Sequence, residues 1–234
     1  MSLRTFILGL VASFGIAWLA VVVIPFFKMR SLEPIVHAEG TEQAGEVFFP
    51  KRTGRIVNGA AVYAANGCYL CHTQVIRPTY AGNDMFRSDW GGLADDEDRG
   101  DTRRETNAWD FLGESYAHIG VTRMGPDLSN FGRRLEANYL EEGQSPEDWI
   151  YYHLYRPFNR ADLRIGRATC PPHPFLFEKK KIAGQGSDEA LDVDACEGHE
   201  VVPGSEVKAL ASYLISLKKD QAVPAQLDFS PGKK

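Results

Sequence analysis

The stretch Cys68-Tyr69-Leu70-Cys71-His72 places two cysteines three positions apart and a histidine directly after the second. It follows the segment from Arg55 to Asn66, in which apolar residues recur at helical spacing. Gly67 ends that segment, as glycine commonly does at the C-terminus of a helix. The sequence therefore places two thiols and an imidazole close together just beyond a predicted helix.

Two thiols at this spacing, followed at once by an imidazole, are what covalent attachment of haem c requires. Each thiol adds to one vinyl group of the haem, and the spacing then brings His72 to the iron as the proximal ligand. A thioredoxin-like Cys-x-x-Cys would require a βαβ surround, whereas the upstream segment is helical. A zinc site would require a second ligand pair at short spacing, and Cys170 and Cys196 lie too far away. We therefore expect one covalently bound haem c, held by Cys68, Cys71 and His72.

The run from Thr5 to Phe27 contains no ionisable side chain and is followed by Lys28 and Arg30. At about 1.5 Å per residue, it is long enough to cross a hydrocarbon core of about 30 Å. The h-region of a signal peptide is shorter, about 7–15 residues, and only a weak cleavage site, at 36–38, follows this run. Residues 1–30 are therefore predicted to be a transmembrane anchor. Haem c is attached on the outer, oxidising side of a bacterial inner membrane, so we expect a single-pass protein with a periplasmic haem domain.

The chain has 234 residues, a formal net charge of −5, 44% hydrophobic and 24% charged residues. This mixture argues against disordered and fibrous proteins, and the acidic balance argues against nucleic acid as a partner. Further helices are predicted from Ser145, an N-cap followed by Pro146, to Tyr155, and from Ser205 to Leu217. No stretch alternates convincingly as a strand. The predicted fold class is mostly α.

The domain boundaries are predicted from charge and from proline and glycine content. Dense mixed charge indicates exposed loops, and the segment after the last helix is expected to be peripheral. The predicted parts are the anchor at 1–30, a linker at 31–54, a periplasmic domain at 55–219 with insertions at about 82–118 and 179–204, and a tail at 220–234.

Three other places in the chain resemble class I cytochromes c. The helix before the motif carries a small residue and an aromatic, Gly59 and Tyr63, and the last helix carries Tyr213-Leu214. Between them lies Gly125-Pro126-Asp127-Leu128, similar to the Gly-Pro-x-Leu segment of these proteins. The resemblance implies a class I cytochrome c-like helical domain with long loop insertions, in which the first and last helices cross at the small residue.

The same resemblance gives Pro126 a role. In these proteins the proline carbonyl accepts the Nδ1 hydrogen of the proximal histidine, which here is His72. Such a bond orients the imidazole ring and raises its basicity. The alternative is that Gly125-Pro126 is only a loop turn.

Four longer stretches occur in order: CHTQVIRP at 71–78, RMGPDLSNFGRR at 123–134, HLYRP at 153–157 and PPHPFLFE at 171–178. Together with the anchor, they resemble the membrane-anchored monohaem subunit (subunit II) of cbb3-type haem–copper oxidases. The resemblance implies an electron-transfer subunit that takes electrons from a cytochrome donor and passes them to the catalytic subunit, where oxygen is reduced. The implied partners are the catalytic haem–copper subunit, other cytochrome subunits and membrane lipid.

The sequence departs from this family where a sixth iron ligand is expected. The family has a pattern like Met-Pro-x-Tyr-Pro, whereas this chain has Cys170-Pro171-Pro172-His173-Pro174, and its four Met all precede Pro126. His173 is the leading candidate, since imidazole is a common haem ligand. The alternatives are Cys170, Met85, His118, His199 and an open site. Because Met ligation raises the potential of a haem, we expect a potential below that of a His/Met relative.

Cys170 and Cys196 are also candidates for a disulfide, since two spare cysteines in an oxidising compartment are more often bridged than free. Such a bridge would remove Cys170 as a ligand and fix the loop that carries His173. Arg77 is a candidate partner for a haem propionate, because a guanidinium fork fits a carboxylate. Solvation of Arg77 at the surface is the alternative.

Other functions are compatible with the same motif. A nitric oxide reductase or another quinol-linked respiratory complex would keep the electron-transfer role in a different assembly. A haem-based sensor would have an open sixth position and would bind carbon monoxide in its ferrous form. An assembly subunit with an incidental haem would tolerate mutation of His72 without loss of turnover by the complex.

Overall fold

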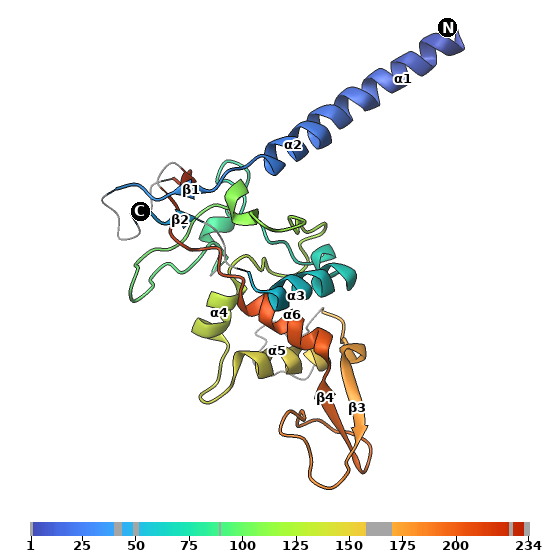
Figure 1. The fold of residues 1–234 in the computed structure, drawn as a ribbon, viewed down its shortest axis with the longest axis vertical. Coiled ribbons are helices and arrows are strands. Elements are labelled where there is room, and N and C mark those ends of the chain that lie inside the picture. Colours follow the sequence, from blue (N-terminus) through green and yellow to red (C-terminus); the bar gives the residue numbers. More distant parts are fainter. Residues whose placement is uncertain are drawn as a thin grey trace.

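The computed structural model describes residues 2–39, 44–48, 52–88, 90–157, 170–224 and 227–231. One long helix projects from a mostly helical domain (Figure 1). The α-helices are α1 (Leu3–Trp18), α2 (Ile24–Arg30), α3 (Gly54–Ala65), α4 (Phe131–Asn138), α5 (Pro146–Tyr155) and α6 (Ser205–Ile215). The strands are β1 (Ile35–Val36), β2 (Val47–Phe48), β3 (Phe177–Lys181) and β4 (His199–Pro203).

The projecting helix is continuous from Leu3 to Arg30, because a π-helical stretch, Leu19–Val23, joins α1 to α2. Pro25 lies just after that stretch and has no N–H to donate, which accounts for the local change in hydrogen bonding. The helix has 28 residues, and its most apolar window has a mean hydropathy of 2.6 and no buried residue. The prediction of an N-terminal helix long and apolar enough to cross a membrane is confirmed.

The three predicted helices of the domain are also present, as α3, α5 and α6. The start of α5 is as expected, because the Ser145 hydroxyl accepts a hydrogen bond from the Asp148 N–H at 3.0 Å. At the end of α3, Gly67 has a φ of +68°, a left-handed conformation that glycine adopts without strain. Helix α4, which ends at Asn138, was not among the predicted helices.

The core of the domain lies where α3 and α6 cross, side by side in Figure 1. A Cβ atom on Gly59 would lie against the Ala209 carbonyl oxygen and 2.6 Å from the Tyr213 Cβ, so only glycine allows this approach. Helices α4 and α5 add side chains to the same core. Its large buried members include Tyr63, Leu128, Phe131, Leu135, Trp149, Ile150, Leu154, Leu210, Tyr213 and Leu217.

The prediction of a chain without strands is wrong. Strands β1 and β2 pair antiparallel within the predicted linker, and β3, which begins just before the predicted 179–204 insertion, pairs antiparallel with β4 near its end. Val201 and Val202 on β4 are buried, whereas the lysines on β3 are exposed, so a largely charged stretch forms a strand by pairing with an apolar one. The β3–β4 hairpin extends from the end of the domain opposite the long helix (Figure 1).

Several residues of the insertion, which was predicted to be an exposed loop, and of the tail, which was predicted to be peripheral, are buried. In the insertion Asp84, Met85, Arg104 and Asp110 are buried, and the Arg104 guanidinium binds both carboxylate oxygens of Asp110, at 2.5 and 2.8 Å. The tail contributes a buried Asp220, which accepts a hydrogen bond from the Thr102 hydroxyl and pairs with Arg99 and Arg133. The tail's Leu227 is likewise only 3% exposed. Both segments are folded together by ion pairs between residues distant in sequence.

The insertion also contacts the base of the long helix. The indole Nε1 of Trp109 donates a hydrogen bond to the Glu33 carbonyl at 2.9 Å, three residues beyond the end of α2. Trp109 therefore connects the domain to the segment that leaves the predicted anchor.

We predict that Gly59→Ala destabilises the domain by about 1–3 kcal/mol, because the added methyl group must displace the backbone of α6. Thermal and chemical unfolding of the full chain in detergent would measure the change. Gly54→Ala, in the same helix, is the matched control: a Cβ there meets nothing within 4 Å, so it should be neutral or slightly stabilising. Equal stability of the two variants would contradict the predicted role of Gly59.

Candidate functional site

The Cys-x-x-Cys-His motif begins directly after α3 with a single 3-10 turn, Cys68–Leu70. The N–H of His72 donates to the Cys68 carbonyl at 3.0 Å, which closes the motif into one compact turn. The Cys68 and Cys71 thiols are free and half-buried, so the two side chains are available for covalent chemistry.

The imidazole of His72 is held by the Gly125-Pro126 segment. Its Nδ1 lies 2.9 Å from the Pro126 carbonyl oxygen, and because a carbonyl can only accept, Nδ1 carries the proton. A Cβ on Gly125 would lie 2.5 Å from Nδ1 and 2.8 Å from Nε2, so the ring rests directly on the glycine backbone. The Nε2 lone pair is therefore left for another partner. This is the contact that the sequence predicted for Pro126, rather than a loop turn alone.

The chain after His72 is fixed by hydrogen bonds on two sides. Asp127 is fully buried and its carboxylate accepts hydrogen bonds from the Thr73 hydroxyl and, at 3.0 Å, from the Val75 N–H. On the other side, the N–H of Gln74 donates to the His118 carbonyl at 3.0 Å. His72 is thus positioned by two loops, one carrying Asp127 and one carrying His118, which bind the residues directly after it.

The crossing of α3 and α6 supports the same segment through two buried tyrosines. The Tyr63 hydroxyl donates to the His72 carbonyl at 3.0 Å, and the Tyr213 hydroxyl donates to the Gln74 Oε1 at 2.9 Å. Burial raises the pKa of both tyrosines, which keeps them as neutral donors. Sequence reasoning selected these tyrosines for the helix crossing but missed their bonds to the motif.

Protonation of His72 is disfavoured where it lies. Burial lowers the pKa of His72, and the nearby positive charge of Arg134 lowers it further, although the Pro126 carbonyl acts in the opposite direction. The imidazole is therefore neutral at pH 7, which is the form that binds metals.

The structure brings Cys170 close to the motif from about a hundred positions along the chain. Burial and then the neighbouring Cys170 thiol raise the pKa of Cys68 to about 11. Burial and then Cys71 raise the pKa of Cys170 to about 11 as well. Cys170 is therefore a protonated thiol at pH 7.

The predicted disulfide between Cys170 and Cys196 is not formed, since both thiols are free. Cys196 is exposed, and Lys179 on β3 donates to its sulfur at 2.7 Å. The two cysteines therefore have different surroundings, one near the Cys-x-x-Cys-His motif and one on the hairpin.

His173 lies three residues after Cys170 and is 8% exposed. Its N–H donates to the carbonyl of Leu154 at the end of α5, at 2.7 Å, which fixes the loop. Its ring Nδ1 has no hydrogen-bond partner among the described residues, although it is buried. Burial lowers the pKa of His173, although an interaction with the Pro171 backbone acts in the opposite direction, so its imidazole is neutral at pH 7. These are the properties of a side chain suited to binding a metal.

Two other predicted site residues have different surroundings. Met85 is completely buried and packs on the backbone of Gly91, where a Cβ would lie 3.3 Å from the Met85 Cγ. The guanidinium of Arg77 binds both carboxylate oxygens of Asp84, each at 2.9 Å. The expected pairing of Arg77 with a haem propionate therefore competes with an ion pair inside the protein.

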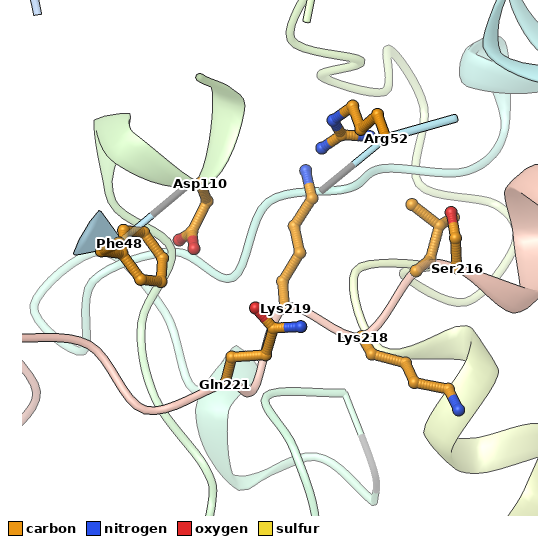
Figure 2. Close-up of a pocket in the computed structure, with 8 residues that line it drawn as sticks. Phe48, Arg52, Asp110, Ser216, Lys218, Lys219 and Gln221 are labelled. Atoms are coloured by element: carbon orange, nitrogen blue, oxygen red, sulfur yellow. The ribbon is translucent and has the colours of Figure 1, made fainter. Parts of the chain in front are cut away.

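A pocket near the end of α6 is lined by Arg52, Asp110, Lys219 and Gln221, among others, and Figure 2 shows the Lys219 amine extending toward Arg52. The Lys219 Nζ lies 3.5 Å from a Glu114 carboxylate oxygen, and Arg52 pairs with the same carboxylate. Burial lowers the pKa of Lys219. Glu114 of the insertion is thus joined by ion pairs to Arg52, before α3, and to Lys219, after α6.

No group of three or more His, Cys, Asp or Glu side chains in the described part of the chain is arranged to hold a metal ion. No protein-family model matches the chain, and no curated protein matches it.

The burial of His118 predicts how the stability of the domain depends on pH. This residue is buried against the rings of Tyr63 and Tyr213, and burial lowers its pKa below the ordinary value of 6.5. At pH values between the lowered pKa of His118 in the folded chain and its ordinary value, the unfolded chain binds more protons than the folded one. The free energy of unfolding therefore falls as the pH falls below about 6.5. We predict that His118→Phe, which keeps an aromatic ring in place, makes the unfolding temperature less sensitive to pH between 7 and 5. Melting curves across this range would test it, and an unchanged pH dependence would contradict it.

Proposed function

We propose that this chain is a membrane-anchored c-type cytochrome that transfers electrons, with a class I cytochrome c-like domain. The observation that carries the proposal is the geometry of His72: Nδ1 is bonded to the Pro126 carbonyl, the ring rests on Gly125, and Nε2 has no hydrogen bond to any of the described residues. The free thiols of Cys68 and Cys71 precede it at the spacing that haem attachment requires. The residues present therefore fit a covalently bound haem c.

In this proposal Cys68 and Cys71 would form thioethers with the haem, and His72 Nε2 would be the proximal iron ligand. The haem supplies one-electron redox chemistry as its iron alternates between the ferric and ferrous states. The Nδ1–H···O bond to Pro126 fixes the tautomer and orientation of the imidazole and increases its electron donation. Tyr63 and Tyr213 hold the backbone and side chains of the same segment in place.

We propose His173 as the sixth ligand. It is a neutral imidazole, its Nδ1 has no hydrogen-bond partner in the described residues, and its backbone is fixed to α5. Cys170 is the competing ligand because it lies near Cys68 and Cys71, but its raised pKa disfavours the thiolate that would bind iron. Met85 is disfavoured by its packing on Gly91.

The wider role follows from the resemblance to subunit II of cbb3-type oxidases and from the long N-terminal helix. In this proposal the chain is anchored in a bacterial inner membrane by one helix, with its haem domain in the periplasm. It relays electrons from a cytochrome donor to the catalytic haem–copper subunit of a terminal oxidase. Copurification of the tagged chain with haem b and copper would support this role. Copurification with haem b and non-haem iron instead would favour a nitric oxide reductase.

Covalent haem attachment is the central test. Membranes from cells that express the full chain with the c-type cytochrome assembly machinery should contain a haem-stained band at the mass of this chain and a pyridine haemochrome spectrum of haem c. Cys68→Ala with Cys71→Ala should abolish both signals because the two thioethers are lost. Cys196→Ala is the matched control and should retain them, since its thiol lies on the exposed hairpin. A wild-type chain that folds but carries no covalent haem would contradict the proposed function.

The sixth ligand can be identified from the haem-bearing full chain. We predict that the ferric protein lacks the near-infrared band typical of Met ligation, and that its potential lies below that of His/Met cytochromes. His173→Met should raise the potential, whereas Cys170→Ser should leave the ferric low-spin spectrum unchanged. A spectrum altered by Cys170→Ser but not by His173→Met would identify Cys170 as the ligand instead.

A further inference from the structure

Among the described residues of the insertion, Asp84 is the most completely buried carboxylate, and the proposed haem site does not use it. Asp84 lies in a 3-10 turn, Asp84–Phe86, and is 0% exposed. One oxygen accepts hydrogen bonds from the N–H and Nε of Arg77 at 3.1 and 2.9 Å, and the other accepts from its Nη2 at 2.9 Å. The Nη2 of Arg123 donates to the same carboxylate at 2.8 Å. Burial alone would raise the pKa of Asp84, but the bonds from Arg77 and Arg123 lower it to about 2.

One arginine belongs to the segment that carries His72, and the other belongs to the segment that orients its imidazole ring. Arg77 ends the segment that begins at His72 itself. Arg123 precedes Gly125-Pro126, the turn on which the imidazole rests and to which its Nδ1 is bonded. Asp84 therefore joins the chain that carries the histidine to the chain that orients it.

Arg123 also has an unusual backbone conformation. Its φ is +51°, and among the described residues it is the one non-glycine residue with a positive φ. This left-handed conformation is unfavourable for a side chain with a Cβ, so surrounding contacts must hold it. The ion pair with Asp84 is one such contact, and the Arg123 guanidinium lies 5.5 Å from the centre of the Trp90 ring as another.

Gly82 leaves space for the contact between Arg77 and Asp84. A Cβ on Gly82 would lie 2.6 Å from the Nη2 of Arg77, so the glycine leaves room for the guanidinium that binds Asp84. The Arg77 guanidinium is therefore held by close packing against Gly82 as well as by its hydrogen bonds to Asp84.

We propose that Asp84 is a positioning residue for His72, which acts through Arg77 and Arg123 to hold the Gly125-Pro126 turn in place and so sets the strength of the His72–Pro126 hydrogen bond. The inference rests on the proposed haem function. It assigns the insertion a role in tuning the redox potential.

Loss of the Asp84 carboxylate charge is expected to raise the redox potential. Arg123 relaxes from its left-handed conformation, the Pro126 carbonyl moves away from His72, and the imidazole becomes a weaker electron donor. A weaker donor stabilises ferric iron less, so the potential rises. Removal of a negative charge near the iron also raises the potential. The potential alone therefore does not separate positioning from simple electrostatics, and a second measurement is needed.

The test compares Asp84→Asn with the wild type as the full haem-bearing chain in detergent. At a fixed applied potential we expect the reduced-to-oxidised ratio to increase by roughly tenfold, which corresponds to about 59 mV for a one-electron couple. In the reduced protein, we expect the NMR resonance of the His72 Nδ1 proton to move upfield as its hydrogen bond weakens. Asp96→Asn removes the same charge from the same insertion, where Asp96 pairs with Arg99, and should leave that resonance unchanged.

Arg123→Gln provides a second variant in case Asp84→Asn does not fold. It keeps the Cβ and loses the ion pair, so the Nδ1 resonance should move in the same direction. A shifted potential with an unchanged Nδ1 resonance would overturn the inference, because the effect would then be one of charge alone. Haem-bearing variants with unchanged potential and resonance would overturn it while the proposed function stands. A wild-type chain without covalent haem would overturn both.

Discussion

The close approach of α3 to α6 at Gly59 is the constraint on which the rest of the domain depends. It sets the distance at which Tyr63 and Tyr213 face the segment after the Cys-x-x-Cys-His motif, and these tyrosines bind the His72 carbonyl and the Gln74 side chain. The position of the motif is therefore determined by two helices that lie at opposite ends of the domain sequence. The Cys-x-x-Cys-His motif is contiguous in sequence, but its position depends on the contact between α3 and α6, which are far apart in sequence.

Buried carboxylates, together with apolar side chains such as Met85 and Leu227, hold the other half of the domain together. Asp84, Asp127 and Asp220 are each buried, and each is surrounded by donors from more than one segment. A buried carboxylate is tolerable only when its bonds are satisfied, because desolvation of an unpaired charge is strongly unfavourable. Each of these aspartates therefore defines the arrangement of several loops at once, which is how a charged insertion acquires a fixed structure.

The helix crossing at Gly59 and the His72–Pro126 bond were expected from the resemblance to class I cytochromes c. The other parts of the structure that were predicted correctly are those encoded locally. The long apolar helix, the N-cap of Ser145 and the stop at Gly67 need only neighbouring residues, and so does the motif from Cys68 to His72. The missed features depend on partners far along the chain: β3 pairs with β4, and Thr102 binds Asp220. The predicted disulfide was wrong for the same reason, because counting cysteines carries no information on where Cys170 and Cys196 lie. Asp84 gave no signal, since a lone aspartate in a charged loop is ordinarily solvated.

The hydrogen bond from the Trp109 indole to the Glu33 carbonyl has a consequence for partner encounter. With the long helix in a membrane, a domain joined so near the end of that helix cannot drift far from the bilayer surface. In the proposed membrane role, any partner held in the same bilayer would be met by diffusion in two dimensions rather than three.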